Sequence, residues 1–335
     1  MTMKFKLILL GLLFTASSVF AGAGAGAIDL LKVPAGAKTQ AMGGAYTAVT
    51  DDLEAFDVNP AGLGQINGTD ILFVHDMYLD GIFFDSLYFA NGSPDGGTYG
   101  GSLKYLSGGS ITQTNETAAG TYAGTGPAVS AFDFSAAFGY GINLSKLIYS
   151  DFTKNLHTGA VLRFSGESIG SDYLNMAVSA DVGAQYTILL EDADFMTNRG
   201  ETIWNKIGIG FAARNLGTSF SAGLTPMTFA LGAYTQILNL FDSTNRMRIS
   251  MDFDYSTANS IVVAAGLEHL QMFGDFSFAL RAGGNFSPAE RLGSGFGIGG
   301  GLGFRTGQVK YALDYVFMPF SEFGSSQKIG LYIKF

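Results

Sequence analysis

Long stretches of this sequence alternate apolar and polar residues, and the alternation is most regular between Arg246 and Tyr255. The even positions of that stretch are Arg, Arg, Ser, Asp and Asp. The odd positions are apolar: Met247, Ile249, Met251, Phe253 and Tyr255. Because a β-strand turns successive side chains to opposite faces, this stretch predicts a strand with one apolar and one polar face. Similar stretches cover most of the chain and predict an all-β fold.

Fourteen segments of this kind follow one another from residue 69 to the end of the chain. They begin near Thr69, Ile82, Thr98, Ala131, Leu156, Leu174, Trp204, Pro226, Arg246, Ser260, Asp275, Ser294, Gln308 and Gln327. Most run for about 9–13 residues, the length that a tilted strand needs to cross an outer membrane. Since single-chain bacterial barrels have an even number of strands, we predict an antiparallel transmembrane β-barrel of about fourteen strands over residues 69–335.

Alternation alone does not decide whether the apolar face meets lipid, because a soluble barrel or sandwich shows the same period. Charged residues make up 14% of the chain, against about 25% in ordinary soluble domains. The chain also ends in Phe335 on an alternating segment, which resembles the signal read by the barrel assembly machinery. Both features favour a membrane barrel, with its apolar faces outward and a weakly charged polar face inward.

The first 21 residues have the pattern of a secretory signal peptide. Lys4 and Lys6 precede an apolar run from Leu7 to Ala16, and small residues then allow cleavage after Ala21. The alternative is an uncleaved anchor, although the run is shorter than a membrane-spanning helix. Export and a barrel together predict the outer membrane of a diderm bacterium.

Residues 22–68 do not alternate, and we predict that they form a hatch inside the barrel. A barrel of fourteen strands is too wide to be filled by the side chains of its own wall. The segment Ala37 to Val49 predicts a short helix weakened by Gly43-Gly44, and Asn59-Pro60 predicts a turn. These four residues, Gly43, Gly44, Asn59 and Pro60, are the candidate gating residues.

The run GAKTQAMGGAYTAVTDDLEAFDVNPAGL, from Gly36 to Leu63, resembles the N-terminal signature of the FadL-like and PorV-like outer-membrane proteins. The resemblance implies a barrel of fourteen strands with an N-terminal hatch in its lumen. The FadL branch imports long-chain fatty acids or other hydrophobic compounds, and the PorV branch is a partner in protein secretion. We therefore expect a plugged channel for hydrophobic small molecules such as long-chain fatty acids. The alternatives are a barrel that docks a secretion-system protein and a structural surface protein.

Two connections between strands stand out by their composition. Ser107 to Ser130 is predicted to be the longest loop and contains mainly Gly, Thr, Ala and Ser. The loop from Gly217 to Pro226 contains Phe220 and Leu224, which make it the better candidate for capturing a hydrophobic ligand outside the membrane. With the N-terminus in the periplasm, the connections from an odd-numbered strand to the next even one should face outside the cell and be the longer ones. The connection at residues 257–259 is of this kind but short, whereas the connection at residues 191–203 is of the other kind but long.

The sequence offers no catalytic, metal or cofactor site, and we expect a protein that is not an enzyme. The chain has no Cys, which excludes a Cys-ligated metal site. The predicted strands contain its three His residues, and His75 points away from its neighbour Asp76. A net charge of −9 gives no basic surface for nucleic acid. The expected partners are membrane lipid, a hydrophobic ligand and the assembly machinery.

Overall fold

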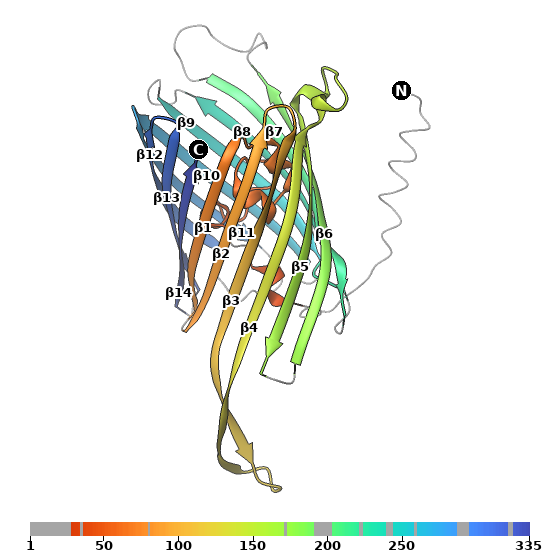
Figure 1. Ribbon diagram of the computed structural model, residues 1–335. Coiled ribbons are helices and arrows are strands. Elements are labelled where there is room, and N and C mark those ends of the chain that lie inside the picture. Colours follow the sequence, from red (N-terminus) through yellow and green to blue (C-terminus); the bar gives the residue numbers. More distant parts are fainter. Residues whose placement is uncertain are drawn as a thin grey trace.

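The described residues form a closed barrel of antiparallel strands (Figure 1). The computed structural model describes residues 28–33, 36–79, 81–170, 173–190, 203–220, 224–238, 244–257, 260–286, 295–320 and 324–335. These stretches contain fourteen strands, and each strand pairs with its neighbours in sequence. The last strand, β14, pairs with β1 from Asp70–Lys334 to Met77–Gln327 and closes the barrel. The predicted all-β antiparallel barrel and its strand count are therefore confirmed.

Thirteen of the fourteen strands begin within two residues of the predicted starts. The strands are β1 Gly68–Leu79, β2 Ile82–Ser93, β3 Gly97–Glu116, β4 Tyr122–Asn143, β5 Leu156–Ile169, β6 Tyr173–Leu189, β7 Ile203–Ser219, β8 Thr228–Leu238, β9 Asn245–Ser256, β10 Ser260–Phe273, β11 Phe276–Phe286, β12 Phe296–Thr306, β13 Val309–Pro319 and β14 Ser325–Lys334. The agreement arises because most strands have one face toward solvent or lipid and one toward the interior, which is the condition for alternation.

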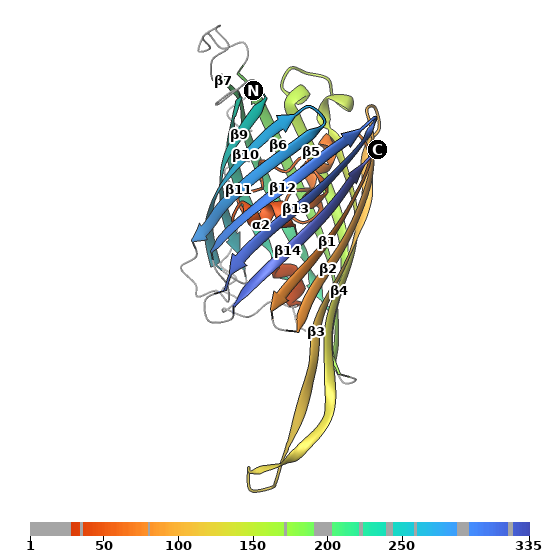
Figure 2. The same ribbon diagram turned by 90° about the vertical axis from the view of Figure 1, so that its left-hand side faces the viewer.

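The fourth strand is the exception, and the predicted loop from Ser107 to Ser130 is wrong. There, β3 and β4 continue as a paired ribbon, with Ser110 opposite Ser130 and Glu116 opposite Tyr122. This ribbon extends well beyond the ends of the other strands (Figures 1 and 2). Most of its residues are exposed, so neither face packs against a core and the sequence shows no alternation there.

The apolar face of the strands points outward, as predicted. On β9, Ile249, Met251 and Phe253 are exposed, and Phe253 has 47% of its surface accessible. The intervening Arg248, Ser250 and Asp252 are buried in the interior.

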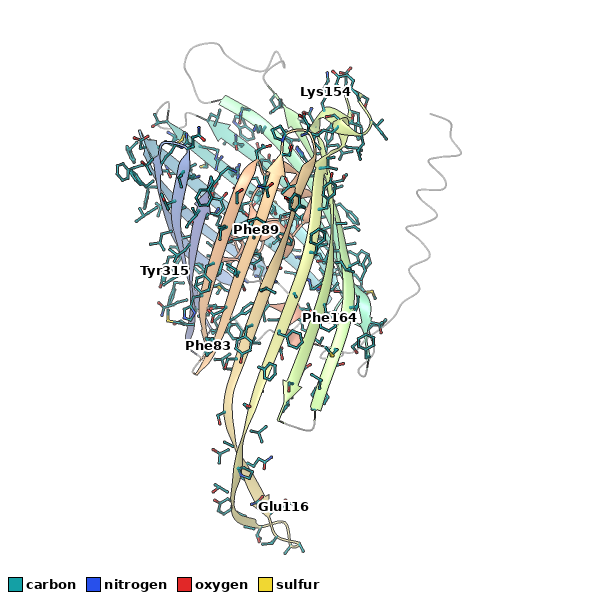
Figure 3. The ribbon with its side chains drawn as sticks, viewed as in Figure 1. Phe83, Phe89, Glu116, Lys154, Phe164 and Tyr315 are labelled. Atoms are coloured by element: carbon teal, nitrogen blue, oxygen red, sulfur yellow. The ribbon has the colours of Figure 1, made fainter. Side chains whose placement is uncertain are left out.

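The same outward coat surrounds the barrel. Figure 3 labels Phe89, Phe164 and Tyr315 among the large apolar side chains that cover the outer wall. An apolar outer band of this kind is what a membrane-spanning barrel presents to lipid.

The barrel has two distinct ends. At the C-terminal end, the N–H of Phe335 donates to the carbonyl oxygen of Thr69 at 2.9 Å, where β14 ends beside the start of β1. The opposite end carries the β3–β4 ribbon, and we call it the ribbon end. Residues 257–259 join β9 to β10 at the ribbon end, and residues 190–202 join β6 to β7 at the C-terminal end. Both connections therefore join the strands that the sequence predicts, and the expected rule for connection length does not hold for them.

The N-terminal segment lies inside the barrel (Figure 1). Its described helices are short: η1 Asp29–Lys32, α2 Ala37–Ala41, η2 Leu53–Phe56 and η3 Pro60–Gln65. The remaining ones, η4 Leu144–Lys146 and η5 Thr153–Asn155, connect β4 to β5. Among the described residues, no helix has the length and apolar character needed to cross a membrane. The predicted signal peptide, residues 1–21, lies outside the described residues.

An apolar core joins this N-terminal segment to the inner wall. From the segment it takes Ile28, Leu30, Leu53, Phe56 and Leu63, and from β1 and β2 it takes Leu72, Val74, Phe84 and Tyr88. All of these side chains are almost fully buried. Residues 28–33 and 36–67 therefore pack as part of the barrel interior.

The outward orientation predicts the effect of a charge at the middle of β9. Met251→Arg should lower the free energy of unfolding in lipid vesicles by about 2–4 kcal/mol, because the guanidinium would sit near the bilayer midplane. Ile188→Arg, an exposed outward position at the end of β6, is the control and should cost about 0–1 kcal/mol because the new charge reaches the interface. Reversible urea unfolding measures both. Equal costs at the two positions would contradict the orientation.

Candidate functional site

The candidate site is the contact between the barrel wall and the N-terminal segment that the sequence predicts as a hatch. We keep the name hatch for residues 22–68, of which residues 28–33 and 36–68 are described. The hatch contacts strands on opposite sides of the barrel. Helix η3 packs on β4, β5 and β6, whereas α2 packs on β11, β12 and β13.

The Gly43-Gly44 turn brings the hatch backbone directly against β11. Both residues have positive φ angles, 65° and 92°, which favour glycine. A Cβ atom on Gly43 would lie 2.2 Å from the backbone nitrogen of Gly284. The side chain of Asn285 donates a hydrogen bond to the Gly43 carbonyl oxygen at 3.0 Å. The predicted helix is correspondingly short, ending at Ala41 before this turn.

Asn59 and Pro60 form the start of η3 and fix its position. The Asn59 side chain accepts from the N–H of Ala61 at 3.1 Å and donates to the carbonyl oxygen of Thr47 at 2.8 Å. Pro60 occupies the first turn of the helix, where its missing N–H leaves no bond unmade. A Cβ atom on Gly183 of β6 would overlap the Asn59 oxygen at 1.9 Å. The predicted turn is thus a buried anchor to the wall.

Asp57 of the hatch lies in a buried cluster with Lys104 and Arg163 of the wall. The Lys104 ammonium forms an ion pair with Asp57, and the Arg163 guanidinium bridges Asp57 at 3.5 Å and Asp181 at 3.0 Å. Tyr88 donates to the second Asp57 oxygen at 2.6 Å. Burial by itself raises the pKa of Asp57, but Lys104 and then Arg163 outweigh it and hold the pKa below its ordinary value. The carboxylate therefore stays charged.

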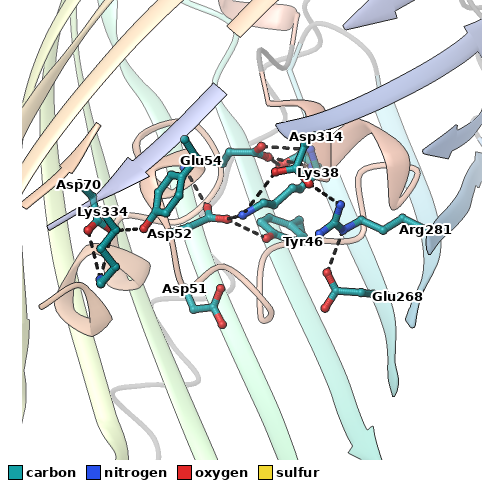
Figure 4. Close-up of polar contacts among 12 residues, drawn as sticks. Lys38, Tyr46, Asp51, Asp52, Glu54, Asp70, Glu268, Arg281, Asp314 and Lys334 are labelled. Atoms are coloured by element: carbon teal, nitrogen blue, oxygen red, sulfur yellow. Dashed lines mark hydrogen bonds and ion pairs between the residues drawn. The ribbon is translucent and has the colours of Figure 1, made fainter. Parts of the chain in front are cut away.

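A second buried cluster holds α2 against the opposite wall (Figure 4). The Lys38 ammonium lies 2.8 Å from an Asp52 oxygen and 4.0 Å from an Asp314 oxygen of β13. Arg281 of β11 then bridges Asp314 at 2.7 Å and Glu268 of β10 at 2.8 Å. Burial lowers the pKa of Lys38, but Asp52 and Asp314 outweigh it and raise the pKa above its ordinary value.

Strand β9 supplies a third set of contacts to the hatch. Arg248 pairs with Asp51 at 2.8 Å. The Asp252 carboxylate accepts hydrogen bonds from the backbone N–H groups of Tyr46 at 3.0 Å and Thr47 at 2.7 Å. The acidic stretch of the hatch and the acids of the wall thus both take part in docking.

These contacts correct the expectation of a weakly charged inward face. The chain has few charges, but many of them gather where the hatch meets the wall. Removing one partner of such a buried pair costs about 3–5 kcal/mol, because the other charge is left uncompensated. Separating both partners into water costs far less, since each charge recovers its hydration. The ion pairs therefore hold the hatch in one position on the wall, and they can separate when water reaches them.

Sequence reasoning did not identify the wall residues of this site. Lys104, Arg163, Arg281 and Asp314 are isolated charges on the polar faces of their strands. Only 14% of the residues of this chain are charged, so a charge on the polar face of a strand could have marked these positions as part of the site. The pairing partners depend on how the hatch threads the barrel, and the alternation of the strands carries no information about that.

The remaining predicted residues form none of the ion pairs described above. Phe220 and Leu224 are exposed at the ribbon end, 72% and 46% accessible, and Leu224 forms a bridge with Thr218. Residues 221–223 between them lie outside the described residues. Phe335 is exposed and joins β14 to the start of β1. Neither position tests the predicted role in capture or in assembly.

Acid should loosen the docked hatch through Asp57. The pKa of Asp57 is lowered by folding, so its stabilisation is present above about pH 3.8, the ordinary value, and is lost as the pH falls below it. Asp51, whose pKa is also lowered through Arg248, acts in the same direction. Hydrogen-exchange protection of residues 53–66 should therefore fall below that pH.

Two checks accompany this measurement. Glu54, whose pKa burial and Asp52 raise to about 7, favours docking as the pH falls from about 7 to 4.5, and so has no part in the acid loss. Asp57→Asn should flatten the dependence below pH 3.8. Protection that survives acid in the native chain, or falls equally in the variant, would contradict the role of Asp57.

Solved structures with a similar fold cover almost the whole chain. The Pseudomonas putida toluene transporter TodX has a TM-score of 0.51 and 12% identity, over 95% of this chain and 98% of that one. The Ralstonia pickettii toluene transporter TbuX has a TM-score of 0.50 and 11% identity, over 89% and 96%. A Pseudomonas aeruginosa FadL homologue has a TM-score of 0.47 and 9% identity, over 90% and 97%. At these identities the similarity shows the barrel fold alone.

Sequence comparison gives the family. No curated protein matches the chain. A family model matches residues 20–273, which include the hatch and the strands from β1 to β10. The chain belongs to the uncharacterised protein family UPF0164.

Proposed function

We propose that this protein is an outer-membrane channel for hydrophobic small molecules and that the hatch is its gate. The observation that carries the proposal is a hatch docked across a closed barrel through ion pairs on two sides, Asp57 with Lys104 of β3 and Lys38 with Asp314 of β13. The outward apolar coat supports a location in the membrane. The transporters TodX and TbuX, named for toluene, have the same fold. The proposal includes no catalytic activity.

The interior supports a hydrophobic rather than a polar ligand. Leu30 and Ile28 of the hatch pack with Val74 and Phe84 of the inner wall, so displacing η1 would uncover an apolar surface. A hydrophobic molecule that replaces these contacts gains roughly 25 cal/mol per Å² of apolar surface removed from water. Long-chain fatty acids are one class of molecule with this property.

The proposed path begins at the ribbon end. A hydrophobic ligand first partitions onto exposed residues there, with Phe220 and Leu224 as the candidate contacts. It then enters the barrel beside η1, and a shift of the hatch opens the way past α2 and η3. The Lys38–Asp314 and Asp57–Lys104 ion pairs separate in that step, and water compensates their charges.

Locking the hatch to the wall should stop transport. A Cβ atom on Gly330 of β14 would lie 3.7 Å from the Ala37 Cβ, close to the mean of about 3.8 Å in disulfides. The chain has no Cys, so Ala37→Cys with Gly330→Cys introduces the only pair. In vesicles loaded with a fluorescent fatty-acid sensor, oxidation should reduce uptake of a fatty acid at least tenfold, and reductant should restore it.

The two single-cysteine variants are the matched controls, and oxidation should leave their uptake unchanged. Deleting Gly36 to Leu63 is the complementary variant, and it should raise the permeation of small solutes through the vesicle wall. Uptake that is equally fast in the oxidised and reduced double variant would overturn the gating role of the hatch. Unchanged permeation after the deletion would do the same.

The β3–β4 ribbon favours one second candidate function, the docking of a secretion-system protein. It presents exposed backbone edges beyond the barrel, where another strand could pair. Shortening the ribbon by removing residues 109–129 separates the two proposals. A channel should keep its uptake after this change, whereas a docking barrel should lose its partner in co-purification.

A further inference from the structure

A polar cavity of about 210 Å³ lies between the hatch and the C-terminal end of the barrel. The hatch contributes Val49, Asp51 and Gln65 to its lining. The wall contributes four residues at the C-terminal end: Asn155 at the end of η5, His157 at the start of β5, Thr187 near the end of β6 and Lys206 near the start of β7. Ala48, Leu189, Tyr234 and Arg248 complete the lining. The cavity lies apart from the apolar core around η1.

Among the described residues that line this cavity, the charges of one cation and one anion cancel, and a second cation remains. Arg248 is neutralised by its ion pair with Asp51 at 2.8 Å. The Lys206 ammonium has no ion pair or hydrogen bond with any residue that the structure describes. Lys206 is half-buried, and it is held inward opposite Gln236 of β8. The cavity is therefore suited to an anion.

A hydrogen-bond donor without an acceptor lies in the same lining. The Asn143 oxygen accepts from Ser145 N at 3.0 Å, so the Asn143 amide nitrogen is the atom that faces His157 Nε2 at 3.2 Å. Because that nitrogen is a donor, Nε2 must accept, and the neutral imidazole carries its hydrogen on Nδ1. His157 Nδ1 is buried and has no hydrogen-bond partner among the described residues. A buried donor in this state is unfavourable until an acceptor reaches it.

We propose that the cavity binds a small oxyanion, a carboxylate or a phosphate, through the Lys206 ammonium, and that a turn of the His157 ring brings its buried Nδ1–H to the same anion. The two groups supply the charge and the directed donor that an oxyanion needs. Thr187 and Asn155 add further donors to the lining. A volume of about 210 Å³ accepts a head group or a free anion. The proposal does not rest on hydrophobic transport, because the site is defined by equilibrium binding and lies beyond the apolar core.

Binding is measured by titration calorimetry on the full-length protein in a non-ionic detergent, with inorganic phosphate and with sodium hexanoate as the two probes. At least one probe should bind saturably. Lys206→Met should weaken that binding about tenfold or more, and His157→Phe should weaken it by a similar factor, since each removes a charge-assisted hydrogen bond. Tighter binding of phosphate identifies a free oxyanion as the ligand, and tighter binding of hexanoate identifies the head group of an amphiphile.

Lys154→Met is the matched control. Lys154 is a cation at the same end of the barrel, but it is exposed on η5 and pairs with Asp151 at 2.8 Å outside the cavity. Its loss should leave the affinity unchanged. Heat-modifiable migration in gels verifies that each variant is folded. Lys206→Gln replaces Lys206→Met if the latter does not fold. Absence of saturable binding by both probes, or an affinity of the Lys206 variant within twofold of the native value, would overturn the proposal.

Discussion

The apolar outward face of the strands determines which side chains point into this barrel. Strands of period two cannot present apolar side chains to lipid without turning the intervening polar ones inward. In β9 this places Arg248 and Asp252 inside the barrel, where burial without partners is costly. The hatch supplies those partners: Asp51 pairs with Arg248, and the backbone N–H groups of Tyr46 and Thr47 donate to Asp252. Wall and hatch therefore satisfy one another.

The contacts of the hatch combine two kinds of interaction that respond differently to water. The apolar core around Leu53 and Phe56 loses stability in proportion to the surface that becomes wet. When the hatch moves, the charges of the Lys38–Asp314 and Asp57–Lys104 ion pairs exchange each other for hydration. A hydrophobic ligand can replace the first kind and water the second. This combination is the physical basis of the gate that we propose.

Alternation alone predicted most of the barrel, because nearly all strands separate an outer from an inner environment. It failed for the ribbon of β3 and β4, where Ser110 and Ser130 pair with neither face buried. The turn at Asn59-Pro60 was predicted from its residues, but its role as a buried anchor required the position of Gly183. The ionic partners of Asp57 and Lys38 come from strands far apart in sequence. Only the three-dimensional path of the hatch brings them together.

The central claim is that the apolar face of the strands meets acyl chains, and spin-label accessibility along β9 tests it most directly. The absence of native Cys allows single labels at each position from 247 to 255 in vesicles. Oxygen collisions should peak at Ile249, Met251 and Phe253, and collisions with a water-soluble nickel reagent should be lowest there. Labels at those positions that are shielded from oxygen or freely reached by nickel would contradict the account.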